Sequence, residues 1–524
     1  MVALPETAAA TRSRATRTLH STLAGSVRPH DEFARPEESK EPSRLVAATT
    51  RFIIESDGRR MSQCGRAIAA SCVATLCLFL IDCSASAGGS KAARGGPVYP
   101  GCAAPTSAPK HIYYSDPVSG SMTSDGSQAH PWGSLSAIVA AGKLPPAATA
   151  VVAPGDALYL LSGDHGSLNI DNGFNSDFIV VQAAPGQHPT LSGITMYGGS
   201  HWMFSGLTIQ NLNNGGYVFG ARLDADDVIF TGSTVLSQPD VSRWTQAEWQ
   251  QGAIAGVNAS GNCVAITNNM IQNVGSAIGV SGSNILVRGN SVDHFGDDGI
   301  DFGQGTDTGT ISNLEISGNT LTNNLDIGDG NHNDGIQGWV LNGTTGTNVL
   351  IDSNIVISQT DPSLPWPGNM QGISEFDGAW DNIHIINNVV VAAAYHGISI
   401  YGAHDSTIIN NTVFGNFVAT NGDVNDTWIG VFSSKDGTPP VNVVVRNNIS
   451  SVYSLADAGV TADHNVTATF PQSMFVKFDR TLFQYDLHPV AGSVELGFGS
   501  SLLAPGYDIT GASRTSPITA GAYQ

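Results

Sequence analysis

Residues 386–412 read INNVVVAAAYHGISIYGAHDSTIINNT, so the stretch begins and ends with the same kind of tetrad, which carries asparagine at its third position. Such tetrads recur along the chain at intervals of 21 to 37 residues, each behind an apolar pair. Their shared asparagines are Asn269, Asn290, Asn319, Asn354, Asn388, Asn411 and Asn448. A repeat of about 21 residues that is lengthened by insertions in some coils predicts a solenoid, in which each coil buries its apolar face against its neighbours.

A second tetrad pattern recurs along the chain together with the asparagine tetrads. The stretch contains HGIS at 396–399, and related tetrads are DGID at 298–301, DGIQ at 334–337 and QGIS at 371–374, with a looser member, IGVF, at 429–432. Short β-rich runs separated by Gly and Asn corners predict an all-β, single-stranded parallel β-helix, whose coils stack about 4.8 Å apart. We expect each corner asparagine to bond the asparagine of the next coil and to adopt left-handed backbone angles there.

Strand alternation assigns the side chains of these tetrads to faces. The isoleucines should point inward: Ile300, Ile336, Ile373 and Ile398. The residues after them should form an outward polar column: Asp301, Gln337, Ser374 and Ser399. The corner before each Gly should be polar: Asp298, Asp334, Gln371 and His396. Two residues beyond the polar column lies a largely aromatic column: Gly303, Trp339, Phe376 and Tyr401.

Aromatic rings beside polar side chains are typical of a sugar-binding groove, and core packing under a loop is the alternative for the rings. We therefore predict these substrate-binding residues: Gln337, Trp339, Gln371, Phe376 and Glu375. Alternation turns Glu375 inward, which requires a bulge or a buried partner. We predict these catalytic residues: His396, Asp298, Asp334 and Tyr401. His396 should lie roughly 14 Å from Asp298, three coils away.

Three carboxylates within one or two coils repel one another unless a pKa rises or a cation binds. We expect Asp298, Asp301 and Asp334 to bind Ca²⁺, which prefers oxygen ligands. The same acids could instead serve as the carboxyl pair of a glycosidase. Turn capping is the structural alternative, because Asp-Gly is a common turn dipeptide.

The N-terminal part differs in composition. We expect residues 1–60, rich in Ser, Thr, Arg, Pro and Glu, to be a disordered or mis-assigned extension. Residues 61–87 have the layout of a signal peptide, with Arg66 before an apolar stretch and then small residues, which predicts a secreted or periplasmic protein. A membrane anchor is the alternative. Cys102 and Cys263 could pair in an oxidising compartment, and the sequence does not decide this.

Charge limits the partners. After residue 87 there are twelve Lys and Arg against thirty-five Asp and Glu, a net charge of −23. This balance argues against nucleic acid and, once the signal is removed, against a membrane surface. We expect a monomer that acts on a polysaccharide.

These repeats resemble the right-handed parallel β-helix superfamily of pectate lyases and related polysaccharide enzymes. HIYYSDPVSGSMTSDGSQAHPWGSLSAI, at 111–138, resembles the first strand and N-terminal capping helix of exported members, and the last residues resemble their closing segment. The resemblance implies a linker, first strand and cap over 88–147, a β-helix over 148–470 and a closing segment over 471–524. It implies β-elimination on a uronate-containing glycan as the leading activity. The alternatives are a glycoside hydrolase, a uronate C5 epimerase, and a non-catalytic glycan-binding or adhesion protein.

Overall fold

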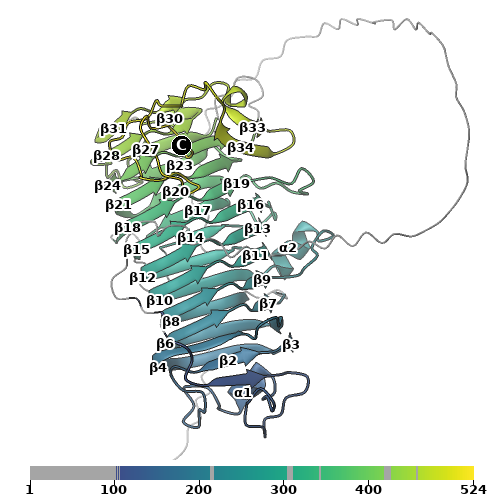
Figure 1. Cartoon of the computed structure of the whole chain (residues 1–524). Coiled ribbons are helices and arrows are strands. Elements are labelled where there is room, and N and C mark those ends of the chain that lie inside the picture. Colours follow the sequence, from purple (N-terminus) through teal and green to yellow (C-terminus); the bar gives the residue numbers. More distant parts are fainter. Residues whose placement is uncertain are drawn as a thin grey trace, which may run out of the picture. The chain divides into compact units, whose positions relative to one another are not determined.

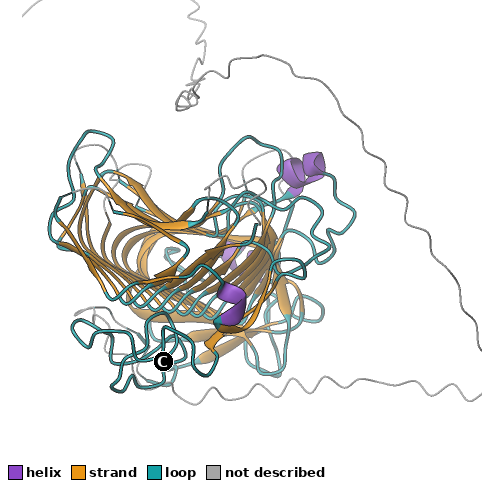
Figure 2. Cartoon of the chain, turned by 90° about the horizontal axis from the view of Figure 1, so that it is seen from above, coloured by secondary structure: helices purple, strands orange, loops and turns teal. Residues whose placement is uncertain are grey.

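The computed structural model describes residues 102, 104–105 and 107–524, apart from 213–217, 304–310, 341–343, 418–425 and 456–457 and the side chains of Phe376 and Asp377. The expected extension and signal peptide therefore lie outside the described residues. The described part is a parallel β-helix, as predicted (Figure 1). Figure 2, which looks down the stack, shows the strands of successive coils one behind another.

Two parallel sheets run along the stack. The larger contains twenty strands: β1 (Ile112–Ser115), β2 (Ala157–Leu160), β4 (Ser167–Ala183), β6 (Gly193–Ser205), β8 (Phe219–Thr231), β10 (Ala255–Thr267), β12 (Ile278–Arg288), β14 (Ile300–Phe302), β15 (Ile311–Ser317), β17 (Asp334–Trp339), β18 (Thr345–Asp352), β20 (Gln371–Asp377), β21 (Ala379–Ile386), β23 (His396–Tyr401), β24 (Ala403–His404), β25 (Thr407–Ile409), β27 (Trp428–Phe432), β28 (Val443–Arg446), β30 (Val452–Ser454) and β31 (Val460–Asp463). The smaller contains twelve: β3 (Gly163–Asp164), β5 (Pro189–Leu191), β7 (Thr208–Gln210), β9 (Thr234–Leu236), β11 (Met270–Val274), β13 (Ser291–Phe295), β16 (Thr320–Asn324), β19 (Ile355–Ile357), β22 (Val389–Ala392), β26 (Thr412–Gly415), β29 (Ile449–Ser450) and β32 (Val466–Thr467).

The remaining elements close the stack or decorate it. Helix α1 (Leu135–Ala140) is the predicted N-terminal cap: the Ser134 side chain accepts a hydrogen bond from the Ala137 N–H, and Leu135 and Ile138 are buried. Helix α2 (Gln246–Gly252) belongs to an insertion. A 3₁₀ turn (Pro471–Ser473) leads into an antiparallel pair, β33 (Phe475–Asp479) and β34 (Gln484–Pro489). Within the described residues, no helix is long and apolar enough to cross a bilayer.

The predicted asparagine ladder is present and one step longer than expected. The Asn354 amide, for example, donates to Asn388 Oδ1 at 3.0 Å, and the last step runs from Asn448 to Asn465. The left-handed backbone angle, however, falls on the residue before each ladder position, such as Asn387 with φ 56°. Each ladder asparagine can therefore keep its amide turned toward the neighbouring coil.

The predicted register of the Gly-Ile strands is confirmed. Ile300 pairs with Ile336, Ile336 with Ile373, and Ile373 with Ile398. All four isoleucines have no solvent exposure. The corner and outward columns therefore lie on consecutive coils of one sheet.

The two cysteines after residue 87 form a disulfide, Cys102–Cys263, across 161 residues of sequence. Cys263 lies in β10, so the bond fastens the segment before β1 to the middle of the stack. The sequence had left this pairing open.

Candidate active site

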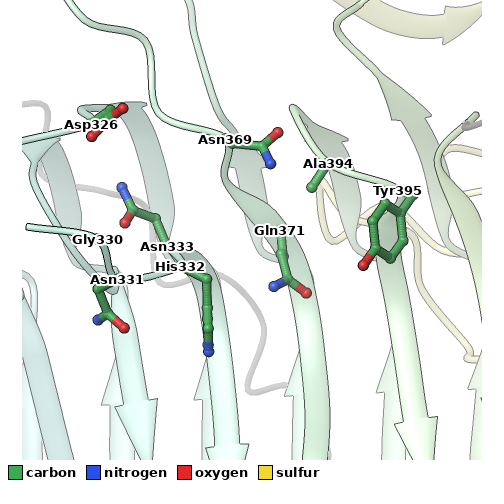
Figure 3. Close-up of a pocket in the computed structure, with 9 residues that line it drawn as sticks. All are labelled: Asp326, Gly330, Asn331, His332, Asn333, Asn369, Gln371, Ala394 and Tyr395. Carbon is green, nitrogen blue, oxygen red and sulfur yellow. The ribbon is translucent and has the colours of Figure 1, made fainter. Parts of the chain in front are cut away.

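A pocket of about 340 Å³ lies at the N-terminal ends of β17, β20 and β23. Its lining comprises Asp326, Gly330, Asn331, His332, Asn333, Asn369, Gln371, Ala394 and Tyr395. Figure 3 shows the side chains of His332, Gln371 and Tyr395 side by side on successive coils. Two of the predicted corner residues adjoin the pocket: Gln371 lines it, and His396 follows Tyr395.

A buried aspartate contacts an exposed histidine at this corner. His332 Nδ1 lies 2.9 Å from Asp334 Oδ2; the His332 side chain is 58% exposed, whereas that of Asp334 is fully buried. The hydrogen bond to Asp334 raises the pKa of His332, against burial and the charge of Lys435, which lower it. Asp334 is held in turn by its own backbone N–H, which donates to Asp298 Oδ1 at 2.9 Å. Asp334 therefore lies beneath the His332 ring and has no solvent exposure.

His396 lies among aromatic rings two coils further along the stack. Its ring centroid is 4.3 Å from that of Tyr395 and 5.1 Å from that of Trp428, and its Nδ1 lies 2.9 Å from the Ser399 hydroxyl. Burial, with a smaller contribution from the charge of His332, lowers the pKa of His396 to about 4. The imidazole is therefore neutral near neutral pH.

The aromatic column is present beside these corners. Tyr401 stacks on Phe432 with ring centroids 4.9 Å apart, and burial raises the pKa of Tyr401 to about 12. Trp339 Nε1 donates to Asp301 Oδ1 at 2.9 Å. Burial raises the pKa of Asp301 to about 7, although the Trp339 bond lowers it. The aromatic column therefore provides partly exposed ring faces beside Asp301 of the polar column, whose pKa is raised to about 7. The Phe376 side chain, predicted to join it, lies outside what is described.

Three of the predicted acids are buried: Glu375, Asp298 and Asp334. Glu375 pairs with Gly338 and has no solvent exposure, so it points into the core. Neither of its carboxyl oxygens has a hydrogen-bond partner among the described residues. Its assignment as a substrate-binding residue is therefore wrong, because the register shift opposite Trp339 comes after Glu375 and does not turn it outward. Burial and the neighbouring charges of Asp334 and Asp301 raise its pKa well above the usual value.

Asp298 is also nearly buried, and burial followed by repulsion from Asp297 and Asp334 raises its pKa well above the usual value. Asp298, Asp301 and Asp334 accept hydrogen bonds from Asp334 N–H, Trp339 and His332 respectively. Among the residues that the structure describes, no three His, Cys, Asp or Glu side chains are placed to hold a metal ion. Asp298, Asp301 and Asp334, which were expected to bind Ca²⁺, do not form such a group in this structure.

Four residues at the site are not among the residues predicted to form it. His332 and Tyr395 are each adjacent to or near a predicted corner, but they precede the strands, where alternation fixes no direction. Trp428 pairs with His396 across an irregular step of the register. Lys435 lies in the loop after β27, where its charge influences His332. A His two residues before the Asp of DGIQ was the signal for the buried acid–base pair.

No family model matches the chain, and no curated protein matches it. Solved structures with the same fold include a pectate lyase, Pel9A, which is 16% identical over 80% of this chain and 98% of its own, with a TM-score of 0.45. A rhamnogalacturonan lyase is 14% identical over 74% and 98%, with a TM-score of 0.32. The A-module of an Azotobacter vinelandii mannuronan C-5 epimerase is 13% identical over 64% and 93%, with a TM-score of 0.35. These likenesses concern the parallel β-helix fold alone.

Proposed function

We propose that this protein is an exported polysaccharide lyase that cleaves a uronate-containing glycan by β-elimination. One observation supports the proposal: His332, whose pKa is raised by Asp334, and Tyr395 line one polar pocket, and the neutral His396 lies directly behind Tyr395 with Tyr401 on the same strand. β-Elimination needs a base for the C5 proton, a positive group near the uronate carboxylate and an acid for the departing oxygen.

His332 supplies the positive group. Asp334 raises its pKa, so the protonated form persists further toward neutral pH than in a free histidine. Lys435 adds a second positive charge nearby. A uronate carboxylate bound against His332 would have its charge balanced there, which favours loss of the adjacent C5 proton.

His396 supplies the base. In the absence of substrate its low pKa reflects burial and the charge of His332. A bound carboxylate balances that charge and thus raises the basicity of His396 at the moment when it is needed. The imidazole then takes the C5 proton, the C4–O4 bond breaks and a C4–C5 double bond forms.

Tyr401 supplies the acid. Its ring centroid lies 6.5 Å from that of His396, and its raised pKa keeps the phenol protonated at neutral pH. The phenol gives its proton to the O4 leaving group, so charge and protons balance. Gln371 hydrogen-bonds sugar hydroxyls at the pocket, and Trp339 stacks on a sugar ring beyond it.

Hydrolysis is the second candidate, because Asp301 titrates near neutral pH on the outward column. A retaining hydrolase needs two carboxyl groups about 5 to 5.5 Å apart that both reach the substrate. Of the possible partners of Asp301, Asp334 has no solvent exposure, whereas Asp298 is 8% exposed, as is His396, so the reaction products are needed to separate the two candidates.

The test is incubation of the full chain with a panel of uronans that differ in sugar and linkage. Ultraviolet absorbance from unsaturated chain ends supports the lyase, and its loss in His396→Ala but not in His384→Ala would assign the base. New reducing ends without that absorbance indicate a hydrolase. Inverted C5 centres in uncut chains indicate an epimerase, and binding without any product indicates a glycan-binding protein; each of these three outcomes overturns the proposal.

A further inference from the structure

A second pocket, of about 350 Å³, lies on the N-terminal coils of the same large sheet. We call it the distal pocket; its lining comprises Phe174, Gly198, Gly199, Asp224, Ala225, Asp226, Ser260, Gly261, Ser281 and Gly282. These residues come from β4, β6, β8, β10 and β12, which Figure 1 shows stacked directly below β14 and β17.

The distal pocket continues the outward columns of the candidate active site. Arg222 pairs with Asn258, Asn258 with Gly279, and Gly279 with Asp301, whose column continues to Gln337. Two residues further along each strand, Tyr197 pairs with Asp224, Asp224 with Ser260, and Ser260 with Ser281. The same column reaches Gly303 and Trp339 on the coils above.

This second column has aromatic rings at both ends and small side chains between them. Tyr197 and Trp339 are separated by five coil steps, roughly 24 Å at 4.8 Å each. Between them lie Asp224, Ser260, Ser281 and Gly303, whose side chains are all smaller than the rings at the two ends. A single extended polymer could therefore contact both pockets.

Two aromatic rings of the distal region are unusually exposed. Phe174, in the pocket lining, is 65% exposed, and Tyr197 is 50% exposed. The Arg222 guanidinium lies over the Tyr197 ring, 5.0 Å from its centroid, and holds that ring in place. Exposed rings beside hydrogen-bonding groups are the usual means of stacking on the C–H face of a sugar.

The charges of the distal pocket favour an uncharged sugar over a uronate. Arg222 Nε donates to Asp224 Oδ2 at 2.7 Å, so its charge is already paired. Ser260 donates to the other oxygen of Asp224 at 2.8 Å, and Asp226 Oδ1 accepts the Asn262 N–H at 2.8 Å. The remaining carboxylate is that of Asp226, which accepts hydrogen bonds from hydroxyl groups but repels an anion.

We infer that the distal pocket binds an uncharged pyranose ring of the glycan, six to eight coil steps, or roughly 29 to 38 Å, from the uronate between His332 and His396. The ring stacks on Phe174, and its hydroxyls donate to Asp226 and Asp224. The inference rests on the proposed function in one respect: the glycan that contacts both pockets is taken to be the substrate of the lyase. It makes the substrate a heteropolysaccharide with uncharged sugars between its uronates.

The test measures binding of neutral and uronate oligosaccharides to the His396→Ala chain by calorimetry. We expect a neutral oligosaccharide to bind, Phe174→Ala to weaken it about tenfold, in line with the loss of one stacked ring, and Asp226→Asn to weaken it less. Phe470→Ala, which removes a ring that is 71% exposed outside the pocket, is the matched control and should change nothing. Equal binding by Phe174→Ala, or binding of uronates alone, would overturn the inference.

The two proposals fail separately. If no uronan is cut but neutral binding depends on Phe174, the lyase proposal fails and the distal site stands. If uronans are cut while Phe174→Ala changes neither neutral binding nor KM on the polymer, the distal site fails and the lyase stands.

Discussion

His332 Nδ1 lies 2.9 Å from the Asp334 carboxylate, and the aspartate is fully buried while the histidine faces the pocket. The carboxylate thus fixes the ring and stabilises its protonated form from beneath. A similar pair, His294 and Asp293 at 2.8 Å, lies on β13 in the smaller sheet. Because the His294–Asp293 pair lies away from the pocket, it serves as a control for the His332–Asp334 pair.

Asp334→Asn should lower the pKa of His332, because it removes the negative charge that raises it. Turnover should fall roughly a hundredfold or more, within the range of a lost acid–base group. The alkaline limb of the pH profile, where His332 loses its proton, should move to lower pH. The pH dependence of kcat/KM measures this, with Asp293→Asn as control; equal losses in both variants would contradict a specific role for Asp334.

His396→Ala should abolish turnover and leave polysaccharide binding intact. In the native chain, kcat/KM should fall as the pH falls through about 4, where the free imidazole becomes protonated. Because bound carboxylate raises that pKa, the acid limb of kcat should lie at higher pH than that of kcat/KM. Coincident limbs would show that the substrate carboxylate does not approach His396.

Trp339 has two separable roles. Trp339→Ala removes the ring and should raise KM about tenfold, as expected for a stacked aromatic. Trp339→Phe keeps a ring but removes the donor to Asp301, which should raise the pKa of Asp301 above about 7. Carbon-13 NMR titration of the aspartate carboxyls measures this shift. An unchanged Asp301 in Trp339→Phe would exclude the hydrogen bond in solution.

The sequence predicted the coils and their register because both depend on simple periodicities. The period of two within a strand places Ile336 inward and Gln337 outward, and the recurring Gly-Ile pairs align the coils. Residues outside strands lack this constraint, so the direction of His332 could not be derived. The spacing of Asp298 and Asp334 predicted their proximity but not their burial, which depends on how the preceding loops cover the corner.

The asparagine ladder supports a prediction about stability. Asn354 accepts hydrogen bonds from the backbone and the side chain of Asn319, and donates to Ile316 O and Asn388 Oδ1. Asn354→Ala leaves these buried groups unpaired at roughly 1 to 3 kcal/mol each, so unfolding should become easier by several kcal/mol. Asn465→Ala, at the end of the ladder, should cost less. Chemical denaturation compares them; equal effects would show that the ladder is not a continuous unit.

Glu375 makes the stability of the coil depend on pH. Its raised folded-state pKa means that the folded chain retains a proton that the unfolded chain loses above about 4.5. The contribution of Glu375 is therefore most favourable below that pH and decreases by about 1.4 kcal/mol per pH unit as the pH rises toward the folded-state value. Glu375→Met fills a similar volume without an ionisable group, so its melting temperature should exceed that of the native chain at pH 8, with a smaller gap at pH 5. Glu495→Met removes a second buried glutamate whose pKa is raised by burial, so it should show a pH dependence of the same sign. If the difference in melting temperature between Glu375→Met and the native chain is the same at pH 5 and pH 8, Glu375 does not change its protonation on unfolding.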